Sequence, residues 1–466
     1  MTPSVAVIGA GISGLSAAHR LRTLLGPGAQ VTVFEQSARV GGVLRTVALA
    51  GRPFDVGAEA FLLRRPEVPQ LLAELGLGEQ LVHTAGAAPS VRAAGRTVGL
   101  PAGTLMGIPS TVDSMREVLS APALAQLAAE PERELRWQPG ADLSVGELVR
   151  ERFGPEVVAR SVDPLLGGVY SGHADSLGVR AAVPALADAL DAGAPSLLAA
   201  AATAVPAAGP GGPVFGALRG GYEQLTSALQ ATVTVRLSCP VTGIARAQRG
   251  WWVQTADGRA QVDAVVLAVP APAVRTLLAP VVPAASRAAV EMALAPTVVV
   301  GLAFAARDVE QQLPRTSGML VATGEPLAAK AFTHSSRKWP HLADGEVILL
   351  RASLGRFGEA VALQVDDAEL VARVRADLAA VHGMSAVPLD VVVQRWGGGL
   401  PQYGPGHPVR VAAIEHAVDA HPGLAVAGAM LHGVGVPACI GTGRAAAERV
   451  VRHLTAGTRH TGVVAP

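Results

Sequence analysis

The sequence has 466 residues, of which 50% are apolar, with a net charge of +1 and only 3% aromatic residues. This length allows roughly two to four domains, and the balanced charge and scarce aromatic residues argue against nucleic-acid binding. Cys239 and Cys439 stand far apart and in no metal-ligand spacing, which predicts no disulfide framework, no metal site and a reducing compartment. No apolar run reaches the ~18–20 residues of a spanning helix and no basic leader is visible, so we expect a cytoplasmic protein with at most peripheral membrane contact.

The first 35 residues predict a strand–helix–strand unit, with strands over 4–9 and 30–35 and a helix over 13–25. A G-x-G-x-x-G pattern joins the first strand to the helix. Its first glycine permits a tight turn, the second lets a pyrophosphate approach the backbone, and the third allows close packing of helix and strand. Glu35 ends the second strand, where a carboxylate can accept hydrogen bonds from a ribose diol. The residues predicted to hold a dinucleotide are Gly9, Ala10, Gly11, Ile12, Ser13, Gly14, Glu35 and Gln36.

The next segments favour FAD over NAD. QSARVGGVLRT (36–46) contains the pair Gly41–Gly42 followed by Arg45, and it resembles the second fingerprint of glutathione-reductase-like flavoproteins. FDVGAEAF (54–61) is similar to the D-x-G-P-E-S-F segment that lies beside the flavin in flavin amine oxidases, porphyrinogen oxidases and phytoene desaturases. That resemblance implies contacts from Gly57, Ala58, Glu59 and Ala60. Alanines replace the usual Pro and Ser here, so we expect contact through the backbone.

The rest of the chain predicts a nucleotide domain made of separate segments. Residues 66–200 are helical in pattern, strands return at 233–270, 297–306 and 346–354, a helix covers 366–382, and the last 45 residues give a strand and a helix. We therefore expect an α/β fold, with a Rossmann-like FAD domain of the p-hydroxybenzoate-hydroxylase or glutathione-reductase type. Its parts are 1–65, 211–290 and 393–466; the inserts are a mainly helical domain at 66–210 and a sheet-containing substrate domain at 291–392. The most linker-like stretch is 204–213.

Three stretches narrow the resemblance further: DPLLGGVYSGHADSLGVRAAVP (163–184), QRWGGGLPQYGPGH (394–407) and GAMLHGVGVPACIGTG (428–443). They resemble segments of the oxygen-dependent porphyrinogen oxidases of haem synthesis, and the likeness extends over essentially the whole chain. It implies further FAD contacts from Val241, Trp396, Gly428, Val434, Gly435 and Val436. The activity it implies is oxidation of a porphyrinogen to a porphyrin by O₂. The Arg-rich composition and the lack of a membrane-insertion signal favour coproporphyrinogen over protoporphyrinogen as the substrate. Its product would be coproporphyrin III, which implies hand-over to a ferrochelatase for insertion of iron.

The residues that would meet the substrate are harder to identify. The resemblance places the backbone of Gly168 near the inner nitrogens of the macrocycle, although a helix-ending turn explains this glycine equally well. Arg92, Arg180 and Arg395 are candidate partners for propionate groups, or else surface and structural arginines. Two other functions stay open. One is an amine oxidase or desaturase, which is disfavoured because the chain has only two lysines and three tyrosines. The other is an FAD-bound porphyrin carrier without catalysis.

Overall fold

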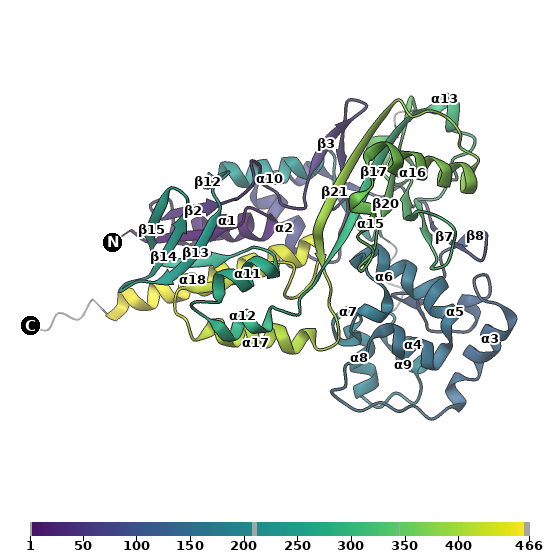
Figure 1. Cartoon of the computed structure of the whole chain (residues 1–466), viewed down its shortest axis with the longest axis horizontal. Coiled ribbons are helices and arrows are strands. Elements are labelled where there is room, and N and C mark those ends of the chain that lie inside the picture. Colours follow the sequence, from purple (N-terminus) through teal and green to yellow (C-terminus); the bar gives the residue numbers. More distant parts are fainter. Residues whose placement is uncertain (1, 207–211, 344, 461–466) are drawn as a thin grey trace, which may run out of the picture.

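The structure is a computed structural model that describes residues 2–206, 212–343 and 345–460. Figure 1 shows a parallel sheet with its helices at one end of the molecule, a large mixed sheet at the other end, and a group of helices beside the mixed sheet. Among the described residues, no helix has the length and apolar character needed to cross a bilayer.

The parallel sheet is built from segments far apart in the sequence. Its strand order is β12 (Thr234–Arg236), β2 (Gln30–Phe34), β1 (Ser4–Ile8), β16 (Ala264–Leu267) and β22 (Leu424–Val426), and every neighbouring pair is parallel. Because successive side chains of a strand point to opposite faces, Val5 and Val7 pack in one core, and Ala6 and Ile8 pack in another. Both faces are therefore covered, as parallel sheets require.

The two covering layers differ. On the first face lie α1 (Ile12–Leu25), α2 (Glu67–Glu74), α10 (Tyr222–Ala231) and α18 (Val436–His460). On the second lie an antiparallel sheet of β13 (Val241–Arg246), β14 (Trp251–Thr255) and β15 (Gly258–Val262), together with α11 (Ala271–Leu278), α12 (Pro283–Ala288) and α17 (His407–Asp419). The predicted strand–helix–strand unit agrees with β1, α1 and β2 to within one residue at each end. The two-residue turn at 256–257 joins β14 to β15.

Helices α1 and α18 pack closely because small residues line their contact. A Cβ on Gly443 would lie 2.3 Å from the Ser13 carbonyl oxygen, and a Cβ on Gly14 would lie 1.9 Å from that of Gly9. Further along, Arg20 and Glu448 form an ion pair of 2.9 Å. The two helices therefore run side by side in the same direction, and α18 begins about two turns before the point where it meets the start of α1.

The mixed sheet has seven strands in the order β21 (Asp390–Pro401), β17 (Leu294–Ala305), β20 (Val347–Leu354), β19 (Ala329–Thr333), β18 (Gly318–Val321), β7 (Pro89–Ala93) and β8 (Arg96–Gly99). Alternate residues again face opposite sides. Val298 and Val300 pack in the core that contains α16 (Asp367–His382), whereas Val299 and Ala303 pack against the hairpin of β3 (Thr46–Leu49) and β4 (Arg52–Asp55). One face of this sheet therefore meets the parallel-sheet domain.

The helical part contains α3 (Ala121–Ala128), α4 (Val145–Phe153), α5 (Pro155–Val157), α6 (Asp163–Tyr170), α7 (Val179–Ala182), α8 (Pro184–Asp191) and α9 (Leu197–Ala204) around one apolar core. The segment 66–210 is less helical than expected, because it includes β7 and β8, which extend the mixed sheet. Ala94 and Gly95, both with positive φ, form the two-residue turn of that hairpin. The expected boundary between 392 and 393 falls inside β21. The expected boundary between 210 and 211 lies outside the described residues. The same holds for much of the expected linker at 204–213.

A buried ion pair holds the helical part together. The guanidinium of Arg152 donates to Glu130 at 2.8 Å and also to the backbone oxygens of Arg133 and Glu134. Glu130 is fully buried, and its carboxylate accepts the N–H groups of Leu197 and Leu198 at the start of α9. The pair therefore joins the segment after α3 to both α4 and α9.

Glu130→Gln should lower the free energy of unfolding by about 3 kcal/mol, because it leaves the charge of Arg152 buried without its partner. Urea denaturation followed by circular dichroism would measure the change. Glu134→Gln is the matched control: Glu134 pairs with Arg136 at 3.8 Å on the surface, so its loss should change stability little. Equal stability of the two variants would contradict this role for Glu130.

Candidate functional site

The glycine-rich turn between β1 and α1 leaves an open, positively polarised surface. Gly9 has a φ of +102°, and a Cβ there would lie 2.4 Å from the Ala268 carbonyl oxygen, so only glycine fits. Gly11 caps α1, and no atom lies within 4 Å of the place where its Cβ would be. No side chain caps the helix and its first turn holds no acidic residue. Ile12 and Ser13 follow in that turn, whose free N–H groups could bind an anionic phosphate.

Glu35 and the second glycine pair lie against this turn. The carboxylate of Glu35 accepts the N–H groups of Ala10 and Ser37, both at 2.8 Å, with Gln36 exposed beside it. The N–H of Gly41 donates to the Ala10 carbonyl oxygen at 2.8 Å, and a Cβ on Gly42 would lie 3.2 Å from the Gly11 Cα. The two glycine motifs therefore form one continuous cradle.

Val241 begins β13 next to Glu35. The N–H of Cys239 donates to the Glu35 carbonyl oxygen at 2.8 Å, and that of Ser238 donates to the Ser37 carbonyl oxygen at 2.9 Å. These two bonds attach the segment before Val241 to the end of β2. The backbone near Val241 thus lies next to Glu35.

Gly57 and Trp396 meet where the β3–β4 hairpin packs against the mixed sheet. A Cβ on Gly57 would lie 1.7 Å from the Val43 carbonyl oxygen and 3.4 Å from the Trp396 ring. The Trp396 indole donates to the Val56 carbonyl oxygen at 2.9 Å. Arg45 donates to the side chain of Gln394, two residues before Trp396 on β21. These contacts bring Arg45 and Gly57, from the N-terminal segment, and Trp396, from β21, to one face of the mixed sheet.

Arg39 joins this group, although the sequence analysis did not select it. Its guanidinium donates to the carbonyl oxygens of Val40 and Gly42, at 3.0 and 2.6 Å, and lies 5.9 Å from the centre of the Trp396 ring. Arg39 therefore links the second glycine pair to Trp396. Its place two residues before that glycine pair was the available signal.

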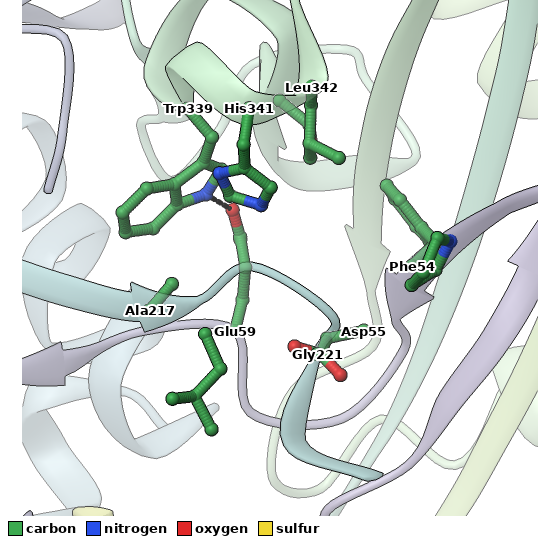
Figure 2. A pocket seen from close by; sticks show the side chains of 11 residues that line it. Phe54, Asp55, Glu59, Ala217, Gly221, Trp339, His341 and Leu342 are labelled. Atoms are coloured by element: carbon green, nitrogen blue, oxygen red, sulfur yellow. Dashed lines mark hydrogen bonds between the residues drawn. The ribbon is translucent and has the colours of Figure 1, made fainter. Parts of the chain in front are cut away.

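Glu59 lies between Gly57 and the mixed sheet, beside Ala58 and Ala60. Figure 2 shows its carboxylate turned toward the Trp339 indole, which donates a hydrogen bond to it, with His341 close by in the same small pocket. Lys338 and Arg351 lie 3.6 and 3.8 Å from the carboxylate. Burial alone would raise the pKa of Glu59, but these two cations and the indole hold it below its usual value. The side chain is thus held inside the protein, and the segment offers its backbone.

The glycines before α18 complete the group from the C-terminal side. Gly428 has a φ of +130°, and its N–H donates to the Thr442 hydroxyl at 3.1 Å. The N–H of Gly433 donates to the Tyr403 hydroxyl at 2.9 Å, which ties the segment 428–443 to the segment 394–407. Val434, Gly435 and Val436 then lead into α18, which begins about two turns before Gly443, the residue that packs against Ser13 at the start of α1.

The candidate substrate residues are not brought together. Gly168 is exposed on α6, and its Cβ would lie 3.5 Å from Leu320 on β18. Each predicted arginine is already bound to a carboxylate elsewhere. Arg180 donates to both oxygens of Asp191 at 2.8 and 2.9 Å, Arg395 donates to Asp367 of α16, and Arg92 lies 3.4 Å from Glu325.

Strand alternation explains why two of these arginines lie away from Trp396. Arg395 precedes Trp396 on β21 and so points to the opposite face, toward α16. Arg92 is opposite Val321 in the sheet register, and Val321 packs in the core under α16, so Arg92 lies on that same face. Its neighbour Val91 lies on the other face and packs in the core of the helical part. Arg180 joins α7 to the end of α8. In this structure each of the three arginines therefore pairs with a carboxylate of the protein itself.

Comparison with known proteins agrees with this arrangement. The family model described as flavin containing amine oxidoreductase matches residues 12–451. A coproporphyrinogen III oxidase from Mycobacterium tuberculosis is 46% identical, with 98% of this chain and 99% of that protein covered. Another, from Staphylococcus aureus, is 30% identical and covers 97% of this chain and all of that protein. A crystal structure of a candidate protoporphyrinogen oxidase from Exiguobacterium sp. 255-15 has a TM-score of 0.85 and 27% identity, with 98% and 99% of the two chains covered.

These matches confirm the predicted fold class, with its nucleotide-binding sheet and inserted mixed sheet, and they confirm the predicted cofactor, FAD. The open cradle at Gly11 fits such a cofactor, because a dinucleotide needs close access to backbone N–H groups at a helix start. The chain therefore belongs to the flavin-containing amine oxidoreductase family and is an FAD-dependent oxidoreductase.

Proposed function

We propose that this protein oxidises coproporphyrinogen III to coproporphyrin III with FAD and O₂. The observation that carries the proposal is the 46% identity to coproporphyrinogen III oxidases along almost the full length of both chains. The absence of a nucleophile–base pair among the residues that the structure brings to the site is consistent with this chemistry, because no side chain accepts the electrons.

We assign the cofactor to the carboxyl edge of the parallel sheet. The adenosine part would lie at Glu35 and Val241, and the pyrophosphate at the start of α1 and at Gly41–Gly42. The isoalloxazine would lie among Gly57–Ala60, Trp396 and the segment before α18. Arg39 and Arg45 would support the cradle from the side of β21. The segments 1–65, 211–290 and 393–466 would form this domain, with the end of β21 shared between it and the mixed sheet.

The bound FAD supplies the electron acceptor, taking six electrons in three steps and passing them to O₂ as three molecules of hydrogen peroxide. The protein has to orient a flexible macrocycle and to limit access of water. Gly168 supports this role through its position, because an exposed glycine on α6 lets a flat ring approach the backbone. The proposal does not require Arg92, Arg180 or Arg395, since each is held by an acceptor of its own.

We also propose where the enzyme works. The near-neutral charge and the expected reducing compartment suit the cytoplasm, with at most peripheral contact to a membrane. The product would be a metal-free porphyrin with four propionates. The class of reaction that must consume it is insertion of a metal into the ring, so a ferrochelatase is the expected recipient.

Coproporphyrinogen should be oxidised faster than protoporphyrinogen under the same conditions. Porphyrin fluorescence and an oxygen electrode would follow the two reactions side by side, with about three O₂ consumed per porphyrin. Equal or reversed rates would contradict the assigned substrate and leave the oxidase class intact. A yellow protein that consumes no O₂ with either substrate would instead be a carrier.

Gly11→Val should lower FAD content at least about tenfold, which corresponds to about 1.4 kcal/mol of binding free energy. The branched side chain would take the space that the pyrophosphate needs. Gly11 has extended backbone angles, φ −69° and ψ 173°, and open space at its Cβ, so the variant should fold. The ratio of flavin to protein absorbance would measure the effect.

The matched control for this variant is Gly28→Val. Like Gly11, Gly28 has no atom within 4 Å of its Cβ position, but it is exposed and lies beyond the far end of α1. It should keep its FAD. Normal flavin content in Gly11→Val would contradict the assigned phosphate site.

A further inference from the structure

Lys330 on β19 is a buried amine with three neutral partners. Its side chain is only 7% exposed. The Nζ atom lies within hydrogen-bond distance of the Ser171 hydroxyl, the Thr297 hydroxyl at 3.1 Å and the Gly355 carbonyl oxygen at 2.5 Å. Thus one lysine joins β19 to β17, to the end of β20 and to the residue that follows α6.

The charged groups around Lys330 are engaged elsewhere. Arg351 donates to the backbone of Asp55 and Gly57, and Arg356 donates to the backbone of Asp163 and Val321. On the side of α6, the Asp163 carboxylate accepts from Ala174 and Thr323, and Glu359 lies 3.3 Å from His173. Burial, reinforced by the charge of Arg356, lowers the pKa of Lys330 to about 7. Its neutral and charged forms are therefore both populated near neutral pH.

The partners of Lys330 suit both protonation states. An ammonium group donates three hydrogen bonds, and three oxygens are present to accept them. A neutral amine donates two and accepts one, and the hydroxyls of Ser171 and Thr297 can rotate to donate it. The site can therefore gain or lose a proton without leaving a buried donor or acceptor unpaired. A change of protonation at a buried site usually costs free energy because it leaves such a group without a partner.

A line of hydroxyls connects Lys330 to the face of the sheet that carries Trp396. The Thr297 and Ser353 hydroxyl oxygens are 3.4 Å apart, and Ser353 is half-buried rather than enclosed. Thr297 is the register partner of Trp396, so the two side chains share a face. Ser353 lies on that face as well, two residues after Arg351, which contacts Gly57. Ser353, Thr297 and Trp396 therefore lie on the same face of the mixed sheet, which is the face where the flavin site is proposed.

We propose that Lys330 accepts, through Thr297 and Ser353, the proton that the macrocycle releases in each oxidation. This inference rests on the proposed function. Each two-electron step removes two hydrogens from the porphyrinogen: one leaves a bridging carbon with the electron pair and would be taken up by the bound FAD, and the other leaves a pyrrole nitrogen as a proton. That proton passes to the Ser353 hydroxyl as its own proton moves to Thr297, and the Thr297 proton moves to the amine, which becomes an ammonium. Hydrogen peroxide formation from O₂ then uses the same proton, so the turn balances as substrate plus O₂ giving oxidised substrate plus H₂O₂.

A purely structural role for Lys330 makes different demands. Ser171 has a left-handed backbone, with φ +57°, at the end of α6, and the lysine helps to hold it. Any cation with similar reach would serve that purpose. Proton acceptance instead requires a group that becomes neutral near pH 7. Arginine retains the charge and the donors but does not become neutral in proteins.

The test compares wild type, Lys330→Met and Lys330→Arg in the anaerobic bleaching of bound FAD by coproporphyrinogen between pH 6 and 8. For wild type we expect the rate to fall about tenfold per pH unit below pH ~7, because the amine must be neutral to accept a proton. Both variants should be about 10²-fold slower and should lose this pH dependence. Flavin content and melting temperature would show whether each variant is folded.

Recovery of the wild-type rate in Lys330→Arg, or an unchanged acid limb in Lys330→Met, would overturn the inference. Ser353→Ala tests the route without touching the contacts that hold α6, and it should slow bleaching about tenfold. An unchanged rate in this variant would also overturn the proposed path. Failure of wild type to react with coproporphyrinogen at all would refute the proposed function instead, so the two outcomes remain distinct.

Discussion

The close packing of α1 against the end of β1 and against α18 is the constraint on which the rest depends. Gly14 lets α1 approach Gly9, and Gly443 lets α18 approach Ser13, so any side chain at either glycine would meet a carbonyl oxygen. Both helices consequently start on the carboxyl side of the parallel sheet, with the start of α18 about two turns further out than that of α1. Helix starts carry partial positive charge, and bringing two of them to one side creates a surface suited to an anionic cofactor. The Glu35 carboxylate and the second glycine pair complete that surface through bonds to Ala10.

The mixed sheet supplies what the parallel sheet lacks. One of its faces carries Trp396, Thr297, Ser353 and Arg351, and Arg351 reaches across to the Gly57 segment. The opposite face is covered by α16 and is used for packing. Helix α6 approaches the sheet at Leu320 and ends at Ser171, which Lys330 holds. The proposed flavin site, the exposed Gly168 and the buried amine are therefore arranged around one side of the sheet.

Local patterns were sufficient for much of the fold and the cofactor site. The glycine spacing, the position of Glu35 and the alternation in β1 depend on neighbours within a few residues, so they can be recognised in a single sequence. The same applies to the second glycine pair and to the glycines before α18. The prediction of a helical segment failed at 81–109, where strands of two to five residues lie between helices. Strands β7 and β8 exist because they complete the edge of a sheet whose other strands come from residues 294–401.

The sequence by itself determined the nucleotide-binding unit, the cofactor class and the family, because each depends on residue types at short, characteristic spacings. Only the tertiary structure decided the roles of charged side chains. Arg92, Arg180 and Arg395 look available in sequence, but each has a carboxylate partner between about ten and more than two hundred residues away. Lys330 looked unremarkable, yet the partners that make it a buried, titratable amine come from residues 171, 297 and 355. Burial and long-range pairing set the charge state of such groups, and neither is encoded in local spacing.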